Sequence, residues 1–127
     1  MAEIVLDASA LIAFLRNEPG ADKVAAALPR SCISAVNLAE TLGKLMGYGK
    51  PLEALAFQVE RLQIPVVPFD EEQARIAASL WQVTRARGLS LGDRACLALA
   101  LTTSLPALTT DREWQSCRSG VEIVPIR

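Results

Sequence analysis

Acidic residues occupy four positions from which a folded chain could do chemistry: Asp7, Glu40, Asp93 and Asp111. Asp7 directly follows the apolar run Ile4–Leu6, and Asp111 follows Ala107–Thr110; both runs have the composition of short strands. The carboxyl ends of parallel strands meet at one edge of an open α/β sheet, where such folds place ligands, so these two aspartates are expected together. Two adjacent carboxylates need a counter-charge. Because only Arg112 lies beside either of them in the sequence, a divalent metal ion is the natural candidate.

The chain contains no histidine. No imidazole is therefore present to take or give a proton, which excludes histidine-based ribonuclease mechanisms and Ser-His-Asp hydrolysis. Water activated by a metal ion is the remaining route to hydrolysis. Mg²⁺ or Mn²⁺ suits carboxylate oxygens, and one or two direct carboxylate ligands suffice for Mg²⁺.

Each aspartate also has a purely structural interpretation. Asp7 and Asp111 could cap the helical segments that follow them, since aspartate is a favoured N-cap. Asp93 has capping-box spacing with Ser90, at the start of a helix that is apolar all round and therefore buried. A cap does not exclude a metal role.

Glu40 has the weakest individual signal. It lies in a helix predicted over 34–46, whose apolar stripe comprises Leu38, Ala39, Leu42, Leu45 and Met46. Helical spacing places Glu40 on the opposite side with Asn37 and Lys44. Periodicity alone therefore favours a solvated ion pair between Glu40 and Lys44, one turn apart.

Strands alternate with helices along the chain, which predicts an α/β fold with a mostly parallel central sheet and helices on both faces. The expected strands are Ile4–Leu6, Cys32–Ile33, Val66–Val67, Ala107–Thr109 and Val121–Val124. The expected helices cover 8–16, 21–28, 34–46, 51–63, 70–87 and 90–103, with a short helical turn around Trp114. A length of 127 residues suits one compact domain.

The composition restricts the location and the partners. Hydrophobic residues make up 51% of the chain and aromatic residues only 5%, so part of the apolar surface is expected to pack against a partner. The longest apolar run, Ala95–Leu101, is far shorter than the roughly 18 residues of a membrane span. No signal peptide begins at Met1, and the three cysteines are expected to be reduced thiols of the core, all of which favours a cytoplasmic protein without a membrane segment.

A net charge of −1 gives no overall basic footprint, so any contact with nucleic acid must be local. Four arginines near the acids are candidates for such a contact, with ordinary surface arginines as the alternative: Arg85, Arg87, Arg94 and Arg112.

Taken together, these features resemble the PIN-domain nucleases, and among them the VapC-type toxins of toxin–antitoxin pairs. The N-terminal IVLDASALIAFLRNEPG is similar to the family's first strand and helix, with Asp7 as first acid and Ser9 as the hydroxyl two residues later. SAVNLAETLGKL places Glu40 as second acid, LSLGDRACLALA is the most specific block and gives Asp93, and ALTTDREW supplies Thr109 and Asp111.

The resemblance implies a single PIN domain over 1–127, an α/β/α sandwich that is usually dimeric. It also implies cleavage of RNA phosphodiester bonds that depends on Mg²⁺ or Mn²⁺, and inhibition by a small antitoxin protein. With the available chemistry, Asp7 and Asp93 are expected as direct metal ligands, and Glu40 and Asp111 as direct or water-mediated ligands and proton acceptors. The hydroxyls of Ser9 and Thr109 would orient them.

Two other classes of protein share some of these features. A phosphoacceptor receiver domain has similar length and an aspartate cluster that holds Mg²⁺, but it requires paired acids after the first strand and a lysine after a late strand; this chain has Asp7-Ala8 and Thr109-Thr110-Asp111. In a non-catalytic interaction module, the aspartates would only cap helices, and no metal would bind.

Overall fold

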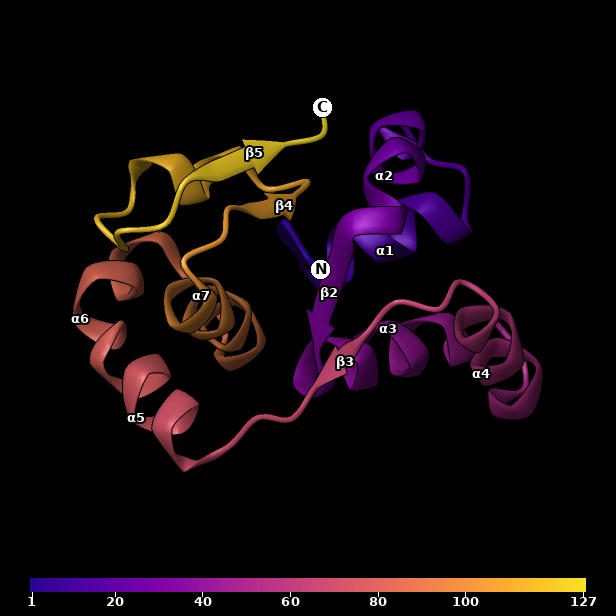
Figure 1. Ribbon diagram of the computed structural model, residues 1–127, viewed down its shortest axis with the longest axis horizontal. Helices are drawn as coiled ribbons and strands as arrows, with labels where there is room; N and C mark the ends of the chain where they lie inside the picture. The colour runs from indigo at the N-terminus through magenta and orange to yellow at the C-terminus, as the bar shows by residue number, and fades with distance from the viewer.

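A parallel sheet of five strands forms the centre of the computed structural model, which describes residues 1–127 (Figure 1). Its strands lie in the order β3-β2-β1-β4-β5, and every neighbouring pair is parallel. The strands are β1 (Ile4–Leu6), β2 (Ser31–Ser34), β3 (Val66–Val67), β4 (Ala107–Thr109) and β5 (Ile123–Pro125). The predicted α/β class and parallel sheet are confirmed, and the first and last parts of the chain meet where β1 pairs with β4.

Helices cover both faces of this sheet, which makes the fold an α/β/α sandwich (Figure 1). The α-helices are α1 (Ala8–Leu15), α2 (Ala21–Ala27), α3 (Ala35–Met46), α4 (Leu52–Glu60), α5 (Glu71–Ser79), α6 (Trp81–Thr84) and α7 (Leu91–Thr103). Short 3-10 turns lie at η1 (Leu28–Arg30), η2 (Arg85–Arg87) and η3 (Arg112–Ser116). None of these helices is long and apolar enough to span a bilayer.

The alternation of side chains along β1 divides the core in two. Ile4 and Leu6 pack with residues of α1 and α2 on one face, while Val5 packs with residues of α7 on the other. All three β1 residues are buried, as expected for the central strand of a sheet that is covered on both sides. The residue that follows them, Asp7, therefore emerges between two layers of helices.

The prediction of one continuous helix over 70–87 is wrong, because this segment is divided into α5, α6 and η2. Where the division occurs, the Ile76 carbonyl accepts both the Ser79 hydroxyl at 2.7 Å and the Leu80 N–H at 3.1 Å. The helix predicted over 51–63 ends at Glu60, and Gln63 takes a left-handed backbone with φ of 55°.

Gly20 combines a left-handed backbone with a lack of space for a side chain. It caps α2 with φ of 94°, and a Cβ atom there would lie 2.6 Å from the carbonyl oxygen of Ile126, beside β5. Gly20→Ala is therefore expected to lower the free energy of unfolding by about 2–4 kcal/mol, through backbone strain plus overlap with packed atoms. Urea melts measure the loss.

Gly49→Ala is the matched control, because Gly49 has φ of 91° but open space where its Cβ would stand. Gly49→Ala introduces backbone strain without overlap, so it is expected to lower the free energy of unfolding by only about 1–2 kcal/mol. Equal losses for the two variants would contradict the role of Ile126.

Candidate active site

Asp7 is a buried carboxylate at the carboxyl end of the central strand, where it also caps α1. Only 4% of the residue is exposed. Its Oδ1 accepts the Ala10 N–H at 2.8 Å, and its Oδ2 accepts the Thr109 hydroxyl at 2.6 Å. The Ser9 hydroxyl lies 2.7 and 2.9 Å from the two oxygens. Asp7 thus both caps α1 at the turn from strand to helix and is a buried carboxylate.

The hydroxyls of Ser9 and Thr109 connect the end of β1 to the end of β4. Ser9 Oγ accepts the Thr110 N–H at 3.0 Å, and Thr109 Oγ1 accepts the Asp111 N–H at 3.1 Å. Because each hydroxyl accepts a backbone N–H, its own proton is free to be donated to Asp7. The two side chains fix the position of the Asp7 carboxylate between the strands.

Burial raises the pKa of Asp7 from 3.8 to about 6. The hydrogen bonds from Thr109, Ala10 and Ser9 lower that pKa, and the nearby charge of Asp93 raises it. Desolvation is the largest of these effects, so Asp7 carries its negative charge near neutral pH at a cost to the fold.

Glu40 extends from α3 and lies against the first turn of α7. The Asn37 side-chain amide donates to Glu40 Oε1 at 2.8 Å and to the carbonyl of Gly92 at 2.9 Å, which ties the two helices together. A Cβ atom at position 92 would overlap the Glu40 carboxylate, so glycine is required for this close approach. Neither Asn37 nor Gly92 is among the site residues predicted from the sequence.

The expected ion pair between Glu40 and Lys44 is absent, and that structural interpretation of Glu40 is wrong. The predicted stripe of α3 is also wrong in part, because Asn37 and Thr41 are buried while Met46 is 44% exposed. The reason is that α3 contacts α1, α4 and α7 at once, so it buries more than one face. The periodicity of α3 gave no signal for Asn37, because it placed this residue on the side opposite to the apolar stripe.

Asp93 lies in the first turn of α7, as predicted, and forms a capping box with Ser90. Its Oδ2 accepts the Ser90 N–H at 2.9 Å, and its own N–H donates to Ser90 Oγ at 3.1 Å. Burial raises the pKa of the Cys96 thiol, one turn further along α7, and the charges of Asp7, Asp93 and Glu40 raise it further. Three of the four acids therefore surround the same part of α7.

Asp111 stands at the exposed rim, after β4. Its Oδ1 accepts the Glu113 N–H at 2.9 Å and caps η3, while its own N–H reaches Thr109. The Thr109 hydroxyl thus contacts both the carboxylate of Asp7 and the backbone N–H of Asp111.

The four carboxylates share one edge of the sheet without converging on a point. No three of them, as they are oriented, stand close enough to hold one ion together, because Asp93 and Asp111 face the N–H groups of their own helical turns. No lysine or arginine forms an ion pair with any of the four. The edge therefore has a concentration of negative charge that no side chain neutralises.

Most of the arginines proposed for nucleic acid are engaged elsewhere. Arg94 donates to the Ala77 carbonyl at 2.9 Å and holds α7 against α5. Arg87 pairs with Glu113 at 3.3 Å, and Arg112 donates to the Arg127 carbonyl at 2.7 Å. Arg85 lies over the ring of exposed Trp81, 4.9 Å from its centre. Their contact with nucleic acid stays a prediction.

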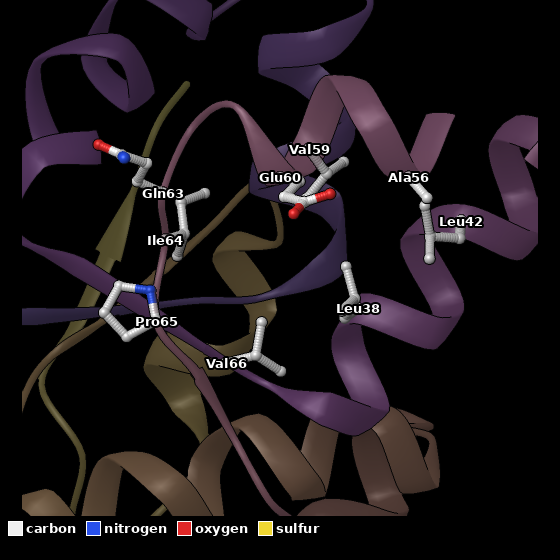
Figure 2. Close-up of a pocket in the computed structure, with 9 residues that line it drawn as sticks. All are labelled: Leu38, Leu42, Ala56, Val59, Glu60, Gln63, Ile64, Pro65 and Val66. Carbon is white, nitrogen blue, oxygen red and sulfur yellow. The ribbon is translucent and has the colours of Figure 1, made fainter. Parts of the chain in front are cut away.

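The largest groove of the molecule does not touch the four acids (Figure 2). It has a volume of about 440 Å³ and lies between α3, α4 and the segment that enters β3, where Leu38, Leu42 and Val59 form apolar walls. α3 is thus shared: Leu38 and Leu42 face the groove, and Glu40 faces α7.

Residues 4–118 match the model of the PIN domain family. Among solved structures, the chain resembles a toxin–antitoxin complex from Klebsiella pneumoniae, with a TM-score of 0.76, 18% identity and 98% of both chains covered. It also resembles FitAcB from Neisseria gonorrhoeae (0.71, 23%, 97% of both chains) and DNA-bound VapBC from Salmonella typhimurium (0.73, 19%, 100% of both chains). No curated protein sequence matches it. At these identities the structural likeness establishes the fold.

The raised pKa of Asp7 predicts that stability falls as pH rises. Between about pH 4 and pH 6 the folded state keeps a proton on Asp7 that the unfolded chain has released, so the free energy of unfolding decreases across that window. Asp7→Asn removes the charge and keeps a capping side chain. In EDTA above pH 6 this variant is expected to be more stable than wild type by about 1–3 kcal/mol, and the difference should vanish near pH 4.

Urea melts between pH 4 and pH 8 measure this difference. Asp70→Asn is the matched control, because Asp70 caps α5 with the same type of bond, from Gln73 N–H at 2.9 Å, but is exposed to solvent. A constant difference between Asp7→Asn and wild type across this pH range would contradict the assigned cost of burying the charge.

Proposed function

Because this chain belongs to the PIN domain family, we propose that it is a single-domain, metal-dependent endoribonuclease that acts in the cytoplasm as the toxin of a toxin–antitoxin pair. The observation that carries the proposal is the uncompensated charge at one edge of the sheet. Asp7 is buried, Asp93 and Glu40 lie close enough to affect the same thiol, and no cationic side chain pairs with any of them. Burying or crowding charges without a partner is costly, and a bound cation would offset that cost.

The donors at this edge fit a hard divalent cation. They are carboxylate oxygens, and the chain has no histidine, while Cys96 is fully buried inside α7. Such oxygen donors suit Mg²⁺ or Mn²⁺. Asp7 and Asp93 would hold the ion directly, and Glu40 and Asp111 directly or through water. A capping bond like that of Asp93 contributes about 1 kcal/mol, which a bound cation can outweigh.

The proposed reaction is in-line hydrolysis of an RNA phosphodiester bond, with a 5′-phosphate product. The ion supplies Lewis acidity, polarising a phosphoryl oxygen and making water a better nucleophile. Glu40 is the proposed proton acceptor, because Asn37 fixes its Oε1 while Oε2 accepts no hydrogen bond. Ser9 and Thr109 hold the Asp7 carboxylate in place, which limits the rearrangement needed when substrate binds.

We also propose an antitoxin partner and a homodimer. The solved structures of similar fold include toxin–antitoxin complexes, and the apolar groove of Figure 2 would accept an apolar helical segment, followed by a basic residue at the acids. Large exposed side chains outside that groove, among them Trp81, Val83 and Leu91, would support self-association. Light scattering and inhibition of cleavage by the partner test these two interactions.

The receiver-domain alternative is not supported. The strand order β3-β2-β1-β4-β5 differs from the 2-1-3-4-5 order of receiver domains, and the family match is to the PIN domain. A non-catalytic module stays as the second candidate, since Asp7, Asp93 and Asp111 do cap helical turns.

Asp7→Asn and Asp93→Asn are each expected to lower RNA cleavage in Mg²⁺ or Mn²⁺ by at least about a hundredfold while the fold stays intact. The amide retains the shape and the cap but loses the charge that binds the cation. Cleavage of a total RNA pool, with circular dichroism as the test of folding, measures the effect. Asp70→Asn is the control that loses a charge at an N-cap away from the site, and it should cleave like wild type.

Wild-type activity in the Asp93→Asn variant would remove Asp93 from the site. Wild-type activity in Asp7→Asn would do the same for Asp7.

Metal binding should be visible without any activity. If the ion binds only the folded state, Mg²⁺ or Mn²⁺ at about ten times its dissociation constant stabilises wild type by about 1.4 kcal/mol in urea melts. Glu40→Gln should gain less from the ion and should be more stable than wild type in EDTA, because one repelling charge is gone. If wild type gains nothing from either ion, the non-catalytic module is the better interpretation.

A further inference from the structure

A polar pocket of about 240 Å³ opens beside the Ser9 hydroxyl that holds Asp7, and none of the four acids lines it. Ser9, which holds Asp7, and Thr110, which follows β4, form one side of it. The other side includes Lys44, at the exposed end of α3, and Tyr48 in the turn that follows this helix. The pocket therefore leads from the carboxylates toward a cationic and aromatic surface.

A second pocket, of about 340 Å³, lies beside Tyr48 and shares that residue with the first. Its walls include Arg16, Asn17 and Lys50. Because Tyr48 borders both pockets, it stands between them as a partition. The two adjoining pockets, together called the path, begin beside Ser9 and end at Lys50.

The ring of Tyr48 is both held in place and exposed. The guanidinium of Arg16 lies over its ring, 3.6 Å from the ring centre, which holds the ring on one face. Tyr48 nevertheless remains 63% exposed. An exposed ring that is held in place has a free surface on which a planar group can stack at little cost in side-chain entropy.

The charge along this path is positive. Lys44 and Lys50 are two of the three lysines in the chain, and neither forms an ion pair with a carboxylate. The carboxylate that borders the first pocket, Glu18, is already matched by Arg16 at 3.8 Å and Arg127 at 3.7 Å. The two lysines are therefore the cations available to an anionic ligand next to the acids.

We propose that these two pockets bind the nucleotides next to the scissile phosphate of a single-stranded RNA, with Lys44 and Lys50 on phosphates and a base stacked on Tyr48. Cations that follow a backbone, alternating with an aromatic platform, are the features by which proteins bind single strands. The inference rests on the proposed nuclease function, since the acids define where the scissile phosphate lies. It assigns substrate contacts to residues at and after the end of α3, and none of them is among the four arginines expected from the sequence.

The chain provides a closely matched control for Tyr48. Phe57 is also 63% exposed and also lies near an arginine, with the Arg61 guanidinium 5.9 Å from its ring centre, but it lies on α4 and lines neither pocket. Lys23, exposed on α2, is the corresponding control for Lys44.

Binding is measured by fluorescence anisotropy with a labelled single-stranded RNA of about 12 nucleotides. The Asp93→Asn background prevents cleavage. Tyr48→Ala should raise the Kd about tenfold, and Tyr48→Phe, which keeps the ring, should restore binding. Lys44→Ala should reduce the slope of log Kd against log salt by about 0.7. Phe57→Ala and Lys23→Ala should change neither quantity, and in the active protein Tyr48→Ala should raise KM more than it lowers kcat.

The outcomes separate this inference from the proposed function. If wild type cleaves RNA but Tyr48→Ala and Lys44→Ala bind like their controls, the path is overturned and the nuclease stands. If the variants lose RNA binding while wild type cleaves nothing, the path stands and the nuclease fails. If these variants instead bind RNA normally but escape inhibition by the antitoxin, the surface is a protein-binding site and the inference is overturned.

Discussion

A carboxylate buried at the end of the central strand is the constraint on which the rest of this structure depends. Asp7 cannot be hydrated, so the protein must supply its hydrogen bonds, and it does so from α1 and from the end of β4. This explains why hydroxyl residues stand at Ser9 and Thr109, since each hydroxyl donates to the Asp7 carboxylate. The three hydrogen-bond donors do not offset the desolvation of the carboxylate, since the pKa of Asp7 stays at about 6. The charge of Asp7 is therefore held in place at a cost to the stability of the fold.

The close approach of α3 to α7 determines whether the other acids can join Asp7. Asn37 spans the two helices by donating to Glu40 and to the Gly92 carbonyl, and the missing side chain at Gly92 leaves room for the carboxylate. A buried amide in this position specifies one orientation of Glu40, because its two donors have fixed directions. Acids from separate parts of the sequence are thus brought to the same edge by contacts between helices and not by the sheet alone.

Local sequence patterns predicted most elements of the fold, since strand and helix signals depend on neighbouring residues. The observed N-caps Ser34, Asp70 and Ser90 are the first residues of the helices predicted over 34–46, 70–87 and 90–103. The environment of Glu40 was not predictable in the same way, because periodicity assumes a helix with one buried face and α3 contacts three other helices. The order of strands, and with it the meeting of Asp7 and Thr109, likewise depends on contacts between residues about a hundred positions apart.

A nuclease of this kind has two opposing electrostatic requirements, because the carboxylates that bind a cation also repel the phosphates of its substrate. A net charge of −1 does not resolve that conflict, so the cations must be placed within about 8–10 Å, the screening length at physiological salt. Glu40 and Lys44 show how one helix can meet both requirements. One turn apart, they do not pair: Glu40 turns to Asn37 and Gly92, and Lys44 borders the pocket beside Ser9. Had they formed the ion pair that periodicity favours, each would have cancelled the charge that the other region needs.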